Sequence, residues 1–194
     1  MTKTIMKKYA ELIARVGANI KKGQPVRLVI SADQYEFATL LVKECYKAGA
    51  SKVLIDWTYQ QIDKLNYRYR TLKSLSTVPA WQEEKLKSMV EEVPCCIYIE
   101  SEDPDGLKGV NQEKMQKSAM ARYKITKPYT DALENKYQWT IAAVPSYEWA
   151  KKVFPGETKR KAYEMLWEAI LKTVYVTKES DPIKEWERHN EELK

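Results

Sequence analysis

The spacing of the apolar residues changes repeatedly along this chain, and this alternation constrains its fold more than any other feature. Ile5, Tyr9, Leu12 and Ile13 recur every three or four residues, which is the period of a helix with one buried face. Residues 26–30 then form a short β-branched run, which is typical of a buried strand. The same switch between the two periods occurs several more times before the chain ends. Such a pattern predicts an α/β fold.

The alternation defines the expected elements one by one. We expect strands at residues 26–30, 52–57, 94–99 and 138–144, and helices at residues 4–21, 34–48, 60–75, 80–92, 112–123, 146–152, 158–174 and from 182 onward. Residues 128–135 are a candidate extension of the fifth helix past Pro128. Strands separated by helices pair in parallel through right-handed crossovers. The chain is therefore predicted to be one α/β domain over residues 1–194, a three-layer sandwich whose mostly parallel sheet has about four or more strands flanked by helices.

Glycine and proline mark the expected ends of these elements. Gly23 and Gly49 each follow a predicted helix, where a left-handed backbone is least costly for glycine. Pro145 ends the last predicted strand, and Pro182 stands at the first turn of the last predicted helix. These residues are expected to specify the fold.

Charge and hydropathy exclude several classes of protein. The net charge is +6, but Lys and Arg alternate with Asp and Glu on most predicted helices, which favours solvated faces over a nucleic-acid groove. No apolar run approaches the roughly 20 residues of a membrane span, and the first residues lack the apolar segment of a signal peptide. We therefore expect a cytoplasmic protein that binds neither nucleic acid nor membrane.

The three cysteines do not suggest a disulfide framework or a metal site. Their number is odd and their spacing fits no known framework. Cys95 and Cys96 are neighbours in a predicted strand, so their side chains point to opposite faces and cannot hold one metal together. We interpret the cysteines as buried small hydrophobic residues.

An open α/β sheet binds ligands at the carboxyl ends of its strands. These ends are predicted at residues 31–34, 56–58, 100–103 and 145–146, and none of them carries a glycine-rich phosphate loop. Asp56 is the polar residue of most interest there, and we favour its interpretation as a helix cap or turn acceptor.

Two further sets of residues raise the question of a metal. The acidic turn at residues 100–106 has carboxylates that suit a hard cation, but its Asp-Pro-Asp-Gly sequence is equally that of an ordinary turn, which we favour. His189, the single histidine, follows Glu185 by about one helical turn. Catalytic zinc normally takes three protein ligands, so we interpret His189 as a surface residue.

We assign no catalytic, cofactor-binding or metal-ligating residue to this chain.

The aromatic residues favour packing over ligand binding. The run of alternating tyrosine and arginine at residues 67–70 could stack on bases, but helix packing with solvated arginines is the favoured interpretation. Trp139, Trp149, Trp167 and Trp186 lie among apolar neighbours and are predicted to belong to the core or to an interface.

Several segments of the chain, taken together, resemble one known family of proteins. They are residues 9–26, 45–53 with 56–57, 139–146 with 149–150, 153–156, 166–170 and 181–190. In this order, over nearly the whole chain, they resemble the N-terminal domain of the M29 metallo-aminopeptidases, the thermophilic type that includes aminopeptidases T and S.

The resemblance implies a cytoplasmic exopeptidase that removes N-terminal residues from peptides with two divalent metal ions of the Zn or Co type. In that family the metal ligands lie in a C-terminal domain, and none of its metal motifs has a counterpart here. The resemblance therefore implies a non-catalytic N-terminal domain, inactive alone, whose partners are a missing C-terminal catalytic domain and a second copy in a homodimer. The alternative is a stand-alone small-molecule or regulatory binding module that reuses the same domain.

Overall fold

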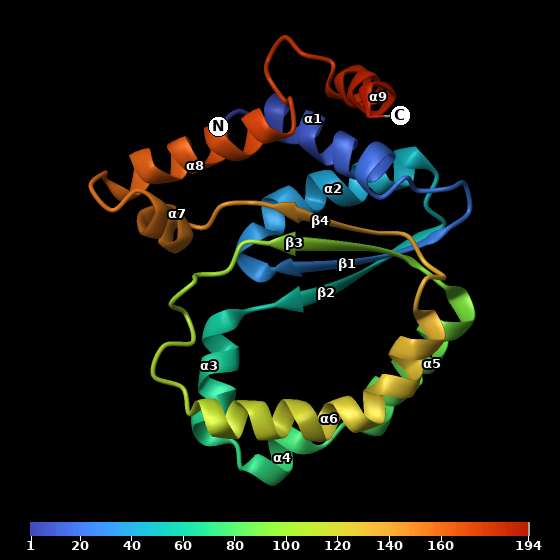
Figure 1. The fold of residues 1–194 in the computed structure, drawn as a ribbon, viewed down its shortest axis with the longest axis vertical. Helices are drawn as coiled ribbons and strands as arrows, with labels where there is room; N and C mark the ends of the chain where they lie inside the picture. Colours follow the sequence, from blue (N-terminus) through green and yellow to red (C-terminus); the bar gives the residue numbers. More distant parts are fainter. Residues whose placement is uncertain (194) are drawn as a thin grey trace. The chain divides into compact units, whose positions relative to one another are not determined.

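Residues 1–193 are described by a computed structural model, in which helices alternate with four parallel strands (Figure 1). The strands are β1 Pro25–Ser31, β2 Lys52–Thr58, β3 Cys95–Glu100 and β4 Trp139–Ala143. The α-helices are α1 Lys3–Leu12, α2 Tyr35–Ala48, α3 Gln60–Tyr69, α4 Leu72–Ser76, α5 Ala80–Glu92, α6 Gln112–Leu133, α7 Tyr147–Val153, α8 Lys159–Thr173 and α9 Pro182–Glu192. The predicted α/β class, with a parallel sheet flanked by helices, is confirmed.

The strand order in the sheet is β2-β1-β3-β4, and every pairing is parallel. The chain therefore first moves from β1 to one side and later returns to the other side of β1. Such an order is doubly wound, and its switch point lies between β1 and β3.

The main core lies on one face of the sheet, where helices α1, α2 and α8 cover the strands (Figure 1). Each helix contributes one aromatic ring to its centre: Tyr9 lies 5.7 Å from Phe37 and 6.3 Å from Trp167, measured between ring centroids. Trp167 is 1% exposed, which confirms its predicted place in the core. All three cysteines are free and buried, as predicted.

The chain folds into two compact units. Unit 1 contains the sheet with α1, α2 and α7 to α9, and it comprises Met1–Thr58, Cys95–Pro104 and the chain from Gln138 onward. Unit 2 is helical and comprises Tyr59–Pro94 and Asp105–Tyr137.

Polar side chains join the helices of unit 2 to one another. The ammonium of Lys114 donates to the carbonyl of Tyr67 at 2.8 Å, and the hydroxyl of Tyr129 donates to Glu83 at 2.7 Å. No helix within residues 1–193 is long and apolar enough to cross a bilayer.

The first helix is shorter than its apolar spacing predicts. The α-helix ends at Leu12, and residues 13–17 form a π-helical turn in which the amide of Ala18 donates to the carbonyl of Ile13. Gly23 has the predicted positive φ of 80°, but it lies in a turn before β1 and not at a helix end. Helical hydrogen bonding continues past Leu12 in the wider π-helical form and ends after Gly17, which is earlier than the apolar spacing predicts.

The structure divides one predicted helix in two, confirms the candidate extension of another past Pro128 and excludes Trp139 from the core. The helix predicted at 60–75 is two helices, because Arg70 adopts an extended conformation and Thr71 caps α4 by accepting the amide of Ser74. Helix α6 runs through Pro128 to Leu133, with both Pro128 and Lys124 on an exposed side where water can reach the carbonyl that proline leaves unbonded. Trp139 is 59% exposed, so it does not belong to the core, and its place in an interface stays a prediction.

Candidate functional site

A charged pair lies on the sheet face opposite the main core. Asp56 lies within β2, and its Oδ2 atom accepts a hydrogen bond from Nε of Arg27, in β1, at 2.7 Å. The two side chains are 21% and 24% exposed. The interpretation of Asp56 as a cap or turn acceptor is therefore wrong, because this carboxylate bridges two strands.

The neighbours of this pair set its electrostatics. Burial lowers the pKa of Arg27, but the hydrogen bond to Asp56 and the negative charge of that carboxylate outweigh this effect and leave the pKa raised. Burial raises the pKa of Cys96, on the same face of β3, and nearby Arg27 offsets part of the rise. A thiol whose pKa is raised is a poor nucleophile at neutral pH. The cluster is therefore a fixed ion pair beside a neutral thiol, not a catalytic dyad.

A sequence signal for Arg27 existed but was missed. Arg27 is the single charged residue within an otherwise apolar strand, and a charge in such a position requires a partner. Asp56, in the neighbouring predicted strand, was the matching carboxylate.

The carboxyl end of the sheet carries a second polar cluster, at the switch point. Ser31, Gln34 and Ser101 are buried there, and Gln34 donates to the carbonyl of Pro145 at 3.2 Å. Because Gln34 follows β1 and Pro145 follows β4, the two strands that flank β3, this hydrogen bond spans the end of β3, where Ser101 lies. The hydroxyl of Ser101, which is 4% exposed, has no hydrogen-bond partner among the described residues. The neighbouring helix α2 also begins without a side-chain cap.

The residues considered for a metal do not converge. His189 packs its ring against Trp186 and Tyr175, at centroid distances of 5.6 and 5.9 Å. Glu185 pairs instead with Arg188 at 2.7 Å. Within residues 1–193 no group of three His, Cys, Asp or Glu side chains could hold a metal ion. The described residues therefore do not fit a metal centre.

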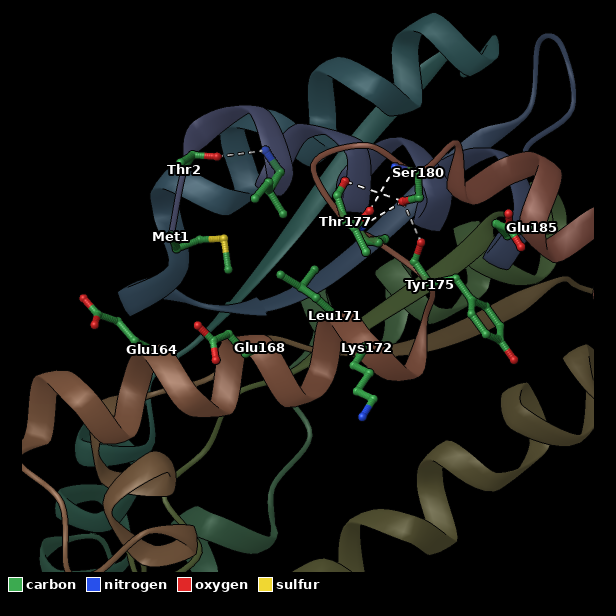
Figure 2. Close-up of a pocket in the computed structure, with 12 residues that line it drawn as sticks. Met1, Thr2, Glu164, Glu168, Leu171, Lys172, Tyr175, Thr177, Ser180 and Glu185 are labelled. Atoms are coloured by element: carbon green, nitrogen blue, oxygen red, sulfur yellow. Dashed lines mark hydrogen bonds between the residues drawn. The ribbon is translucent and has the colours of Figure 1, made fainter.

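A cavity of about 740 Å³ lies in unit 1 between the start of the chain, α8 and the segment that follows it. Figure 2 shows Glu164 and Glu168 on the side of α8 that faces Met1, with Leu171 further along α8 among the residues that line the cavity. Its upper wall is held by Lys8, whose ammonium donates to the carbonyls of Thr177, Lys178 and Ser180 at 3.3, 2.7 and 2.7 Å. No lining residue is a histidine or a cysteine.

The fold defines a doubly wound α/β protein with a parallel sheet flanked by helices. The family model described as thermophilic metalloprotease (M29) matches residues 2–194, and the chain belongs to this family.

Similar proteins agree with that assignment. Aminopeptidase PepS of Streptococcus thermophilus is 35% identical over 190 residues, which are 97% of this chain and 46% of that protein. Aminopeptidase T of Thermus thermophilus is 32% identical over 189 residues, again 97% and 46%. The solved structure of wild-type AmpT from Thermus thermophilus superposes with a TM-score of 0.84 at 31% identity, covering 97% of this chain and 46% of that one. The chain thus spans about half the length of the relatives it matches.

Proposed function

We propose that this chain is the N-terminal, non-catalytic domain of a metal-dependent aminopeptidase that removes N-terminal residues from peptides. The observation that carries the proposal is the family match over residues 2–194, combined with relatives that are named aminopeptidases and are about twice as long. Two divalent ions of the Zn or Co type are proposed for the complete enzyme, where they would polarise the peptide carbonyl and supply hydroxide.

The composition supports inactivity of this chain alone. A catalytic zinc takes three protein ligands, and a two-metal site needs more. The chain has one histidine, which packs among aromatic rings, and its described carboxylates do not gather in a group that could hold a metal. We therefore propose that the metal ligands come from a C-terminal catalytic domain, which is the first partner of this chain.

An activity assay tests this proposal. The purified chain is incubated with leucine p-nitroanilide and short peptides in the presence of Zn²⁺ or Co²⁺, and bound metal is measured by elemental analysis after desalting. We expect no release of p-nitroaniline or of free amino acids and less than one metal ion per chain, whereas aminopeptidase T assayed in parallel serves as the positive control. Chelator-sensitive release by this chain would contradict the proposal.

Three further properties belong to the same proposal. We expect a cytoplasmic protein, peptides as substrates of the complete enzyme, and a homodimer, which light scattering after size-exclusion chromatography would detect. Neither nucleic acid nor membrane is expected as a partner.

A second candidate function is a stand-alone small-molecule or regulatory binding module. The buried, unpartnered hydroxyl of Ser101 at the switch point favours it, because a buried polar atom without a partner costs stability unless something binds it. A thermal-shift screen with metabolites separates the two candidates, since a ligand of the folded state raises the Tm. A rise that Ser101→Ala abolishes would support the module, and no rise with any metabolite would leave the aminopeptidase domain as the function.

A further inference from the structure

Strand β4 forms one edge of the sheet, and its outer side presents free backbone groups. Gln138 accepts from the amide of Cys96 and Val144 donates to the carbonyl of Glu100, which fixes the register of β4 on β3. Backbone groups alternate in direction along a strand, so Trp139, Ile141 and Ala143 point their amides and carbonyls away from β3. The hydroxyl of Tyr9 donates to the outward carbonyl of Ala143 at 3.0 Å, which agrees with this assignment. No described residue pairs with the outward groups of Trp139 or Ile141.

This edge lacks the usual protection against another strand. Natural edge strands carry charged side chains, proline or bulges that prevent pairing. The five residues of β4, Trp-Thr-Ile-Ala-Ala, include no charge and no proline. Trp139 and Ile141 are 59% and 58% exposed, so apolar side chains flank the free backbone groups.

An apolar cavity of about 360 Å³ lies directly beside this edge. Its walls come from the α1 segment and its π-helical turn, from α8 and from α9, and they include Ile13, Val16, Ile170, Val174 and Trp186. The indole of Trp186 is held in place by a hydrogen bond to the carbonyl of Val174 at 3.2 Å. No residue that lines the cavity is charged.

We propose that the β4 edge and this cavity together bind a peptide in an extended conformation. The peptide adds a strand to the sheet by hydrogen bonding to Trp139 and Ile141, and one of its bulky apolar side chains enters the cavity. The free backbone groups require an extended backbone, and the uncharged lining requires an uncharged side chain. This site goes beyond the proposed aminopeptidase function, because it requires no metal and no cleavage of the peptide.

A second copy of this chain fits the edge less well than a peptide. Two β4 strands paired about a two-fold axis would keep the same sheet faces together, so Thr140 and Ala142 of the second copy would be the side chains next to the cavity. Both are small, and both face the cores of their own subunit: a Cβ on Gly17 would lie 2.9 Å from Oγ1 of Thr140, and Ala142 packs against the main core. They therefore cannot fill the cavity, whereas leucine or phenylalanine of a peptide can.

The test uses a capped peptide, acetyl-Lys-Thr-Leu-Thr-Leu-Thr-Lys-amide, titrated into the full chain by calorimetry and tryptophan fluorescence. Its N-terminal α-amine is acetylated, so an aminopeptidase cannot cleave it and the outcome does not depend on the proposed function. Two further peptides carry backbone N-methyl groups on the leucines or on the threonines. We expect saturable binding of the first peptide and loss of binding for one N-methylated peptide but not for the other, because one set of amides faces β4.

Two substitutions locate the site. Ile141→Pro removes an outward amide without removing a β3–β4 hydrogen bond, and we expect it to weaken binding about tenfold, whereas Ile141→Thr retains the amide and the affinity. Thr173→Trp fills the cavity and should also weaken binding, whereas Thr173→Ser should not. The Tm of each variant verifies that it folds.

Several outcomes would overturn the proposal. These are the absence of saturable binding, binding that tolerates both N-methylated peptides, and binding that neither Ile141→Pro nor Thr173→Trp affects. A dimer of the free chain that Ile141→Pro dissociates would assign the edge to a second copy instead.

Discussion

Arg27 and Asp56 form an ion pair on one face of the sheet, and the partial burial of that face explains why the two charges need each other. Both side chains are more than three-quarters buried, at 24% and 21% exposed, and their hydrogen bond joins the two strands on which they lie. A largely buried charge without a partner destabilises the folded state, so each residue offsets the cost of burying the other. The pair lies beside the thiol of Cys96, whose pKa burial raises, and we assign the pair to the stability of the sheet.

Asp56→Asn should lower the free energy of unfolding by about 1–3 kcal/mol, because it leaves the Arg27 cation without its counter-charge. Urea denaturation measures this effect. The control is Glu11→Gln in the exposed pair between Glu11 and Arg15, which should change stability by less than about 0.5 kcal/mol. Equal effects of the two substitutions would show that the strand pair has no special role.

At the scale of elements, two connections depend on specific backbone and side-chain contacts. Gly49 ends α2 with a φ of 112°, as expected for a glycine that follows a helix. The segment that joins α8 to α9 is held by the ammonium of Lys8, which donates to three of its carbonyls. The first contact was visible in the sequence and the second was not.

Gly49→Ala should destabilise the chain by about 1–3 kcal/mol, since the new Cβ would lie 3.0 Å from Cα of Lys22 in a left-handed conformation. Thermal or urea unfolding gives the measurement. Gly156→Ala is the matched control, because a Cβ at Gly156 meets no atom within 4 Å and its φ is not positive. A Gly49 variant as stable as the Gly156 variant would refute the strain at this helix end.

Lys8→Met should loosen the segment between α8 and α9, because three carbonyls lose their donor at a cost of about 1–2 kcal/mol. Hydrogen exchange should show faster amide exchange at residues 174–182 and in α9. Lys7→Met changes an exposed neighbour and should leave the exchange unaltered. Unchanged protection in the Lys8 variant would show that other contacts hold this segment.

At the scale of the whole molecule, the main core places several weak acids away from water. Burial raises the pKa of Cys45 from 9.0 to about 12, that of Cys95 from 9.0 to about 11 and that of Tyr9 from 10.0 to about 12. In the folded state these groups keep their protons to a higher pH than they do in the unfolded chain. Their contribution to stability is therefore complete below pH 9 and is lost as pH rises from about 9 to about 12.

The chain should therefore unfold in alkali with a slope of about 1.4 kcal/mol per pH unit for each titrating group. Urea denaturation at intervals between pH 8 and 11 tests this, with Cys45→Ala as the comparison. The variant should be less stable at pH 8 but should lose stability less steeply above pH 9. Parallel pH profiles for the two proteins would contradict the role of the buried thiol.

The sequence alone was sufficient for the α/β class, the parallel sheet and the family, because short-range periodicity specifies strands and helices and the family segments span the chain. Val26, Leu28 and Cys95 were predicted as buried, and they are. Element boundaries were less predictable, as the early end of α1 and the break at Arg70 show, since local capping and packing decide them.

Tertiary structure alone decided which distant side chains meet. Lys8 reaches Ser180 and Tyr9 reaches Ala143 because the packing of α1 brings them together, and no local pattern encodes those contacts. The free edge of β4 has the same origin: the outward amides of Trp139 and Ile141 are unpaired because no strand lies beside them within residues 1–193. The periodicity of apolar residues extends over a few neighbouring positions, so it can be recognised in the sequence. A contact between residues more than a hundred positions apart forms only when the chain folds, so the sequence pattern does not reveal it.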